Sequence, residues 1–269
     1  SAKFFNKRVT FEVAMSFTDR QVKESFSSAE QLNGFLSMLY NSVEKSMSIK
    51  IDSLIMRTIN NMIAETIKSD YAGSLTDLTQ KSGVKAVNLL YLYNQKYTKT
   101  LTAEQAITNA DFIRFASYTI SLYKDRLSKI STLFNVGGKE RFTAGEYLHT
   151  ILLSDFVSAS DVFLQSNTFN KEMIALPKAE RVPYWQGSGT DYSFAKTSDI
   201  NVTCASGEDI TVSGVIGVMF DRDSLGVSNL NRRVTTNYNA KAEFYNNYYK
   251  FDAGYFNDLN ENFVVFFME

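Results

Sequence analysis

Apolar residues near the start of the chain recur first at every second position and then at helical spacing. Every second residue from Val9 to Phe17 is apolar, which predicts a β-strand over Arg8–Phe17. No hairpin partner follows it in the sequence, so we expect its partner strand to be lost or to come from another molecule. From Ser28 to Lys68 apolar residues recur at helical spacing, interrupted by a polar, briefly alternating stretch around Ser46–Lys50. This spacing predicts one helix of about 60 Å, or two helices with a break near Ser48.

The middle of the chain is predicted to be mainly helical. Capping-box patterns begin at Ser28, Thr102 and Thr143, where a hydroxyl side chain is followed three residues later by Gln or Glu. The predicted elements are an apolar segment at Val87–Tyr97 that fits strand or helix, a helix from Asp111 to Phe134 closed by Gly137-Gly138, a helix from Thr143 through Phe156, and a shorter helix from Ser158 to Gln165.

The last third of the chain changes to the pattern of strands and loops. Tyr184–Tyr192, which contains Trp185, has the composition of a surface loop with aromatic anchors. The continuous apolar run Val212–Phe220 predicts a strand buried on both faces. A turn at Asp221-Arg222-Asp223 follows it. Further strands are expected at Ala242–Phe251 and Asn262–Met268.

Length, charge and cysteine content mainly exclude classes of protein. A length of 269 residues suggests about two domains. The formal net charge of −1 provides no strong field toward nucleic acid or an anionic membrane. No apolar run reaches the ~18 residues of a membrane span. The single cysteine, Cys204, excludes an internal disulfide. The Ser-Ala start without Met suggests a cut upstream, either engineered or by natural maturation.

Candidate catalytic and metal-binding motifs lack the residues that their chemistry needs. His149 is the only histidine, and with Glu146 it supplies too few ligands for a metal. Gly138-Lys139 lacks the earlier glycine and the following Ser or Thr of a phosphate-binding loop. The Asp221 turn resembles a calcium loop but has Arg232 where the bidentate carboxylate belongs. We therefore predict no catalytic, cofactor or metal site.

The arginines at and after this turn are interpreted by their charge. Arg222, Arg232 and Arg233 form a small basic cluster, too narrow for a nucleic-acid-binding face. We interpret them as ion-pairing residues, either within one subunit or between subunits.

The order of elements resembles the major capsid (head) proteins of tailed bacteriophages, which have the Hong Kong 97-type fold. The resemblance rests on three segments: the Gly217-Val-Met-Phe-Asp-Arg-Asp-Ser-Leu-Gly-Val227 strand and turn, the Asn257–Met268 closing segment, and the long helical region from Phe26 to Ile67 with Arg57-Thr-Ile-Asn-Asn61. It implies an α+β fold. Residues 1–18 would be part of an extended loop over a neighbouring subunit, and residues 84–218 an axial domain of mixed sheet with flanking helices. Residues 19–83 and 219–269 would form a peripheral domain with a spine helix and long antiparallel strands, which include the closing strand.

The same resemblance implies a structural function. The chain would be the major capsid protein of a tailed phage or prophage, assembled in the bacterial host and located in the virion. Its copies would form the pentamers and hexamers of an icosahedral head around non-specifically contacted DNA, with scaffolding protein and portal as possible partners and no membrane. Candidate interface or domain-crossover residues are Arg8, Phe11, Phe17, Trp185, Asp221, Arg222, Arg232 and Arg233. The alternatives are an encapsulin-type nanocompartment shell, a phage tail or baseplate component, and a hydrolase that uses His149.

Overall fold

The computed structural model of the chain describes residues 7–18, 20, 28–71, 78–165, 179–187 and 191–269. These residues form two compact units, each made from separated stretches of sequence. Unit 1 comprises Ser1–Thr58 and Gly226–Phe256, and unit 2 comprises Ile59–Leu225 and Asn257–Glu269. The elements are β1 (Arg8–Thr18), α2 (Ala29–Asp70), β2 (Ala86–Asn88), α3 (Leu89–Tyr97), α4 (Ala103–Ala106), α5 (Ala110–Leu127), β3 (Leu148–Leu153), α6 (Ser154–Gln165), β4 (Glu180–Val182), α7 (Phe194–Thr197), β5 (Ile200–Thr203), β6 (Asp209–Val212), β7 (Val215–Asp221), β8 (Leu225–Asn239), β9 (Phe244–Asn257) and β10 (Phe263–Phe267).

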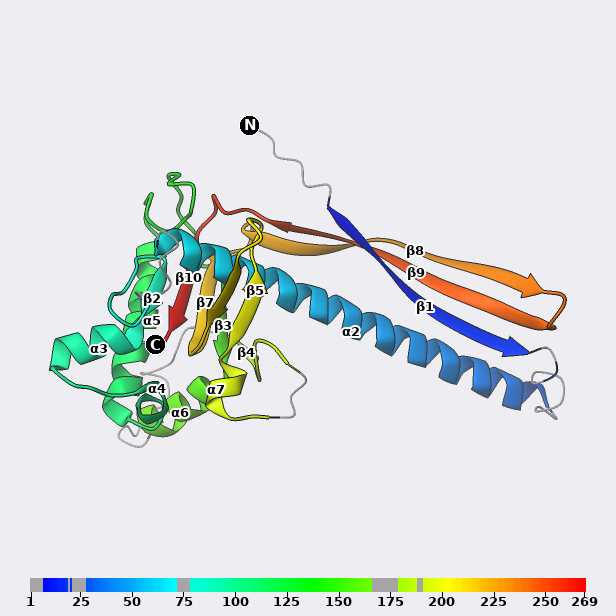
Figure 1. Ribbon diagram of the computed structural model, residues 1–269, viewed down its shortest axis with the longest axis horizontal. Coiled ribbons are helices and arrows are strands. Elements are labelled where there is room, and N and C mark those ends of the chain that lie inside the picture. The colour runs from blue at the N-terminus through cyan, green and yellow to red at the C-terminus, as the bar shows by residue number, and fades with distance from the viewer. Residues whose placement is uncertain (1–6, 19, 21–27, 72–77, 166–178, 188–190) are drawn as a thin grey trace. The chain divides into compact units, whose positions relative to one another are not determined.

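Unit 1 is a three-stranded sheet whose apolar face packs on the first part of α2 (Figure 1). The sheet order is β1-β9-β8, and β1 pairs antiparallel with β9 from Arg8↔Gly254 to Thr18↔Phe244. Alternate residues of β1 face the helix because side chains in a strand alternate between the two faces. The core contains Val43, Met47, Leu54, Phe251 and Ala253, with Phe11, Val13 and Met15 packed against it.

The predicted first strand is confirmed, but the prediction about its partner is wrong. β1 pairs with β9 of the same chain, and Thr10 and Asp252, which face each other in this pair, lie 242 positions apart. The alternating pattern of β1 shows that one face is buried. It carries no information about which distant segment supplies the neighbouring backbone.

The long-helix prediction is confirmed in its continuous form. α2 runs without interruption from Ala29 to Asp70, and the Ser28 hydroxyl accepts a hydrogen bond from the Gln31 N–H (3.3 Å) at its start. Ser48 lies within the helix, and its hydroxyl donates to the Glu44 carbonyl one turn earlier (2.9 Å).

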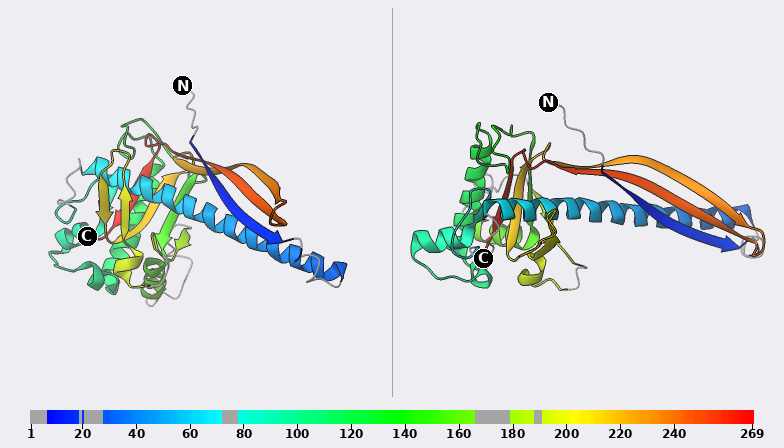
Figure 2. Two further views of the ribbon diagram at one scale, coloured as in Figure 1. Left: turned by 45° about the vertical axis from the view of Figure 1, so that its right-hand side comes forward. Right: turned by 45° about the horizontal axis from the view of Figure 1, so that its top comes forward.

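Unit 2 is built around a five-stranded mixed sheet in the order β2-β10-β7-β3-β4 (Figures 1 and 2). β7 pairs antiparallel with β10 and with β3, whereas β10–β2 and β3–β4 are parallel. α3, α5 and α6 bury one face of this sheet against a large apolar core. On the other face the Tyr71 ring, directly after α2, meets the Phe267 ring edge-on at 6.2 Å. All seven residues of β7 are buried, which confirms a buried strand before Asp221. The predicted strand began at Val212, however, and this residue ends β6 instead.

Two helical predictions in unit 2 need correction. α5 ends at Leu127, whereas the sequence pattern predicted a helix that continued to Phe134. The predicted Thr143–Phe156 helix is instead β3 followed by α6, which begins at Ser154. The apolar residues from Leu148 to Phe156 fit either period. The strand forms because β7 and β4 supply hydrogen-bond partners on both sides of it.

The strands at the end of the chain are divided between the two units. β8 and β9 lie in unit 1 with the first part of α2, but β10 lies in unit 2 and pairs with β7 and β2. All five residues of β10 are buried, and such a continuous apolar run requires cover on both faces. The boundaries of the compact units, after Thr58, Leu225 and Phe256, also differ from the limits that the resemblance implied.

Candidate crossover and assembly sites

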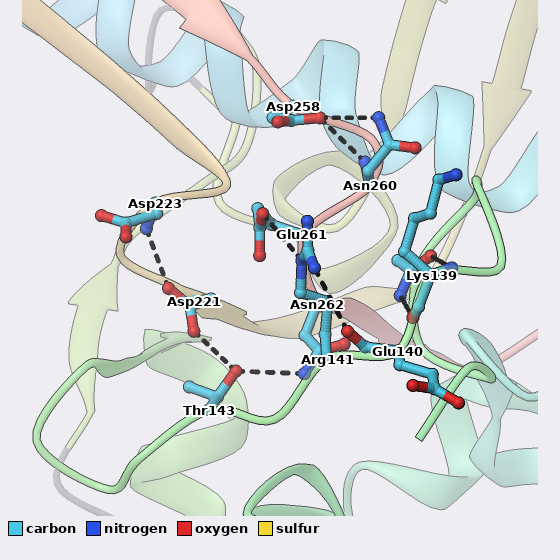
Figure 3. A network of polar contacts seen from close by, with 11 residues as sticks. Lys139, Glu140, Arg141, Thr143, Asp221, Asp223, Asp258, Asn260, Glu261 and Asn262 are labelled. Atoms are coloured by element: carbon cyan, nitrogen blue, oxygen red, sulfur yellow. Dashed lines mark hydrogen bonds and ion pairs between the residues drawn. The ribbon is translucent and has the colours of Figure 1, made fainter. Parts of the chain in front are cut away.

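The turn after β7 is held by a buried carboxylate, that of Asp221 (Figure 3). Its two oxygens accept hydrogen bonds from the Thr143 hydroxyl (2.7 Å) and from the Asp223 backbone N–H (2.9 Å). The Asn262 side-chain amide in turn donates to the Thr143 hydroxyl (3.1 Å). Asp221 therefore ties its own turn to the loop before β3 and to the segment that leads into β10.

Two chain segments of unit 2 meet at this turn, one before and one after the residues that belong to unit 1. The Asp221 N–H donates to the Asn262 carbonyl (3.0 Å), and the Asp258 N–H donates to the Ser224 carbonyl (2.6 Å). The Asp258 carboxylate also accepts from the backbone and side chain of Asn260, at 3.0 and 2.9 Å (Figure 3). The outgoing segment 221–225 and the returning segment 257–262 are thus bonded to each other.

An ion pair supports the same region from the loop before β3. Arg141 Nε donates to Glu261 Oε1 at 2.9 Å (Figure 3). Burial raises the pKa of the Glu261 carboxyl, and the hydrogen bond from Arg141 opposes that rise. An arginine that holds a partly buried carboxylate fits an anchoring role better than a catalytic one.

Arg222 lies beside this network, with its side chain largely exposed. Its guanidinium stacks over the Tyr147 ring at 4.7 Å, and its backbone N–H donates to the Tyr147 carbonyl (2.9 Å). Its contact with the Asp223 carboxylate is long, at 3.7 Å, and exposed. Such a pair contributes little to stability.

In unit 1, Arg232 and Arg233 each bind an acidic side chain of the same chain. Arg232 contacts both Glu44 oxygens (3.0 and 3.1 Å), and its guanidinium lies 5.6 Å from the centre of the Phe251 ring. Arg233 binds Asp252, whose carboxylate also accepts from the Thr10 hydroxyl (2.6 Å). The prediction that these arginines form ion pairs is confirmed, and the partners lie within one chain.

The Asp252 carboxylate is the centre of a polar cluster that crosses all three strands of the sheet. Its pKa is lowered, first by the hydrogen bond from the Thr10 hydroxyl and then by Arg233, with a smaller contribution from the charge of Arg8. The charged form of Asp252 therefore stabilises the association of β1, β9 and β8.

The two phenylalanines of β1 that the sequence proposed as interface residues face the helix side of the sheet. The Phe11 ring stacks on Phe251 with centroids 6.3 Å apart and packs against the unit 1 core. Phe17 is partly buried opposite Tyr245. Arg8, in contrast, is exposed at the start of the strand.

Trp185 is an internal anchor of unit 2 rather than a surface residue. Only 1% of it is exposed, and its indole N–H donates to the Val215 carbonyl at 2.7 Å. The Asn60 side-chain amide donates to the Trp185 carbonyl (2.9 Å). The expected surface loop is correct for the exposed Tyr192 but wrong for this residue.

His149 and Cys204, the residues considered for catalysis, lie in surroundings that do not favour a reactive side chain. His149 lies on β3 rather than on a helix, with its ring stacked on Phe220 at a centroid distance of 5.7 Å. Burial raises the pKa of the Cys204 thiol to about 11, which disfavours the reactive thiolate. Among the described residues, no three His, Cys, Asp or Glu side chains are grouped to hold a metal ion. Within the same residues, no helix is long and apolar enough to cross a membrane.

Several residues of these networks were not found from the sequence. Thr143 was interpreted only as a helix cap, and Asn262, Glu261 and Asp252 were not singled out. Most of their partners lie between 78 and 242 positions away along the chain, although Arg233 is only 19 positions from Asp252. The one available signal was the concentration of Asp and Asn just after β7 and before β10, where polar side chains commonly fix turns.

Comparisons with known proteins agree with this architecture. The chain is similar over 97% of its length, and over 70% of the other chain, to a structure described as the capsid of Staphylococcus phage Andhra, with 9% identity and a TM-score of 0.56. It has the same coverage, 10% identity and a TM-score of 0.58 with a structure described as the head fiber and inner core protein gp22 of native bacteriophage P68. These likenesses show the fold.

The family is shown by a comparison of the sequence itself. No curated protein is similar enough to match. The model of the Phi29-like phage major capsid proteins, however, matches residues 1–267, nearly the whole chain. The chain belongs to the Phi29-like phage major capsid protein family.

Proposed function

We propose that copies of this chain build the pentamers and hexamers of an icosahedral phage head, and that the chain acts by assembly without catalysing a reaction. The observation that carries the proposal is the family match over residues 1–267, together with a fold shared with phage capsid structures. The same match favours a phage head over an encapsulin shell, a tail component or a hydrolase.

An exposed sheet edge in unit 1 supports a role in contacts between copies. β8 is an edge strand, and all its residues from Ser228 to Asn239 are exposed, among them Leu230, Val234 and Tyr238. Monomeric proteins usually shorten or cover such an edge, because its free backbone groups can pair with another chain. In a subunit whose copies pack against one another, this edge is available for that packing.

The two units fit the two domains expected of a capsid subunit. We assign the peripheral role to unit 1, which has long strands and the first part of the long helix, and the axial role to unit 2, which has the mixed sheet and flanking helices. β1, which pairs with β9 in unit 1, is assigned to the extended loop. In this assignment the limits follow the compact units, so the β10 strand belongs to the axial domain.

The charge of the chain supports self-association over specific nucleic-acid recognition. With a formal net charge of −1, copies repel one another only weakly, and packaged DNA is contacted without sequence selection. Scaffolding protein and portal complete the set of proposed partners.

The test is assembly of the full-length natural protein, expressed alone and with its scaffolding protein. We expect rings or shells in negative-stain electron microscopy and fast-sedimenting species in analytical ultracentrifugation. Persistent monomers at every concentration, with and without scaffold, would contradict the proposal.

A further inference from the structure

Unit 2 has a basic groove with aromatic walls between α3 and α5, here called the α3–α5 groove. It has a volume of about 420 Å³. The residues that matter for its chemistry are Lys96, Tyr97, Lys99, Arg114, Phe115 and Tyr118. Tyr97 and Tyr118 are 48% and 64% exposed. Solvent-exposed tyrosines beside an arginine are the residue types enriched in protein interfaces.

The charge of this groove selects an acidic partner. Lys96, Lys99 and Arg114 are positive and Asp111 is the one acidic residue of the lining, so the groove carries a formal charge of +2 on a chain whose net charge is −1. Asp111 is already engaged with Arg114 at 3.2 Å. The Lys96 ammonium lies 5.3 Å from the Tyr97 ring centre and 5.4 Å from the Phe115 ring centre, which holds one cation over the aromatic wall.

A complementary surface, here called the Glu140 tip, is formed by Glu140 and Phe142 of the same unit. Arg141, between them, forms an isolated antiparallel bridge with Ser131 through two 2.9 Å hydrogen bonds, and its side chain is tied inward to Glu261. Because neighbours in extended backbone point to opposite sides, Glu140 and Phe142 project away from that anchor. Both are exposed, Phe142 by 59%. The tip therefore presents a carboxylate and an aromatic ring, with the exposed Lys139 directly before them in the chain.

The tip cannot reach the groove of its own chain. The Thr143 N–H donates to the Leu127 carbonyl (2.8 Å), which places the tip at the C-terminal end of α5. The groove is lined by the first half of that helix, and Phe115 lies twelve residues before Leu127, about 18 Å along the axis. Figure 2 shows the green segment after α5 at one end of this helix and α3 toward the other.

We propose that the Glu140 tip of one copy docks into the α3–α5 groove of the next copy, with Phe142 against the tyrosines and Glu140 beside Lys96 and Lys99. The inference rests on the proposed shell function and names one of its contacts. Because two different surfaces of the chain meet, the contact is heterologous. Such a contact repeats from copy to copy and closes a ring when the rotation permits.

Charge reversal on each side tests the contact. In Glu140→Lys the tip is positive and meets a positive groove, and in Lys96→Glu/Lys99→Glu the groove is negative and meets a negative tip. Each variant of the full-length chain, in the conditions in which wild type associates, should associate at least about tenfold more weakly by sedimentation velocity, because like charges are opposed at every contact. Glu146→Lys, at an exposed glutamate outside the tip, is the matched control and should associate like wild type.

Mixing the two defective variants gives the decisive readout. In a ring with an even number of copies, such as a hexamer, the two variants can alternate, so that every positive tip meets a negative groove and every negative tip meets a positive groove. An equimolar mixture should therefore associate within about threefold of wild type, although neither variant does so alone. Misfolded variants would not rescue each other in this way.

Three results would overturn the inference while leaving the proposed function intact: wild-type association of Glu140→Lys, an equal defect in Glu146→Lys, or a mixture no better than its components. If the wild-type chain itself does not associate, both the proposed function and the proposed contact are contradicted.

Discussion

Replacement of Asp221 by alanine tests whether the hydrogen bonds that its carboxylate accepts from Thr143 and Asp223 stabilise unit 2. The change leaves the buried Thr143 hydroxyl and the Asp223 N–H without their carboxylate acceptor. Hydrogen bonds to a charged group contribute about 1.5–3 kcal/mol each. Because the hydroxyl can still interact with Asn262, we expect the free energy of unfolding to fall by about 3 kcal/mol in total. For a unit of this size that lowers the melting temperature by about 6–12 °C.

The assay is urea and thermal unfolding followed by circular dichroism, with Asp223→Ala as the matched control. The Asp223 side chain is 76% exposed and makes only the long contact with Arg222, so its removal should change stability by less than about 0.5 kcal/mol. A stabilising role for the Asp221 carboxylate is refuted if Asp221→Ala lies within about 1 kcal/mol of wild type, or if the two variants are equally destabilised.

Two further predictions concern the indole anchor and the polar cluster of unit 1. Trp185→Phe leaves the buried Val215 carbonyl without its donor and should lower the free energy of unfolding by about 1–3 kcal/mol; an unchanged urea midpoint would contradict this. Asp252 has a folded-state pKa below its ordinary value of 3.8, so its contribution to stability is present above that pH and is lost as the pH falls through the folded pKa. The stability difference between wild type and Asp252→Asn should therefore shrink below about pH 4 in urea titrations, and a constant difference would count against the Thr10–Asp252–Arg233 cluster.

Local features of the fold were predictable because their causes are local. The Thr102 capping box is present with both of its reciprocal hydrogen bonds, and α2 is continuous where apolar residues keep the helical period. β7 was predictable because a short continuous apolar run that ends at a turn is typical of a strand buried on both faces. Its start was not, because the predicted strand began at Val212, which ends β6.

The errors concern interactions between distant parts of the chain. The Leu148–Phe156 pattern fits helix and strand alike, and only β7 and β4 decide in favour of β3. In the candidate sites, likewise, the kind of interaction was predictable but the partner residue was not. Arg232 and Arg233 could be identified as ion-pairing residues from their charge, but Glu44 and Asp252 could be named as their partners only from the structure. Trp185 was misplaced because a composition typical of a surface loop does not reveal that one of its side chains points inward.

The pairing of β1 with β9 has a consequence for synthesis of the protein. Thr10 and Asp252 lie 242 positions apart, so β1 leaves the ribosome long before its partner strand exists. At 5–20 residues per second the delay is roughly 10–50 s. Through this interval the alternating face of Phe11, Val13 and Met15 lacks the strand that pairs with it in the native unit. Unit 1 is therefore completed only late in translation, and chaperones have their longest opportunity to act on its first strand.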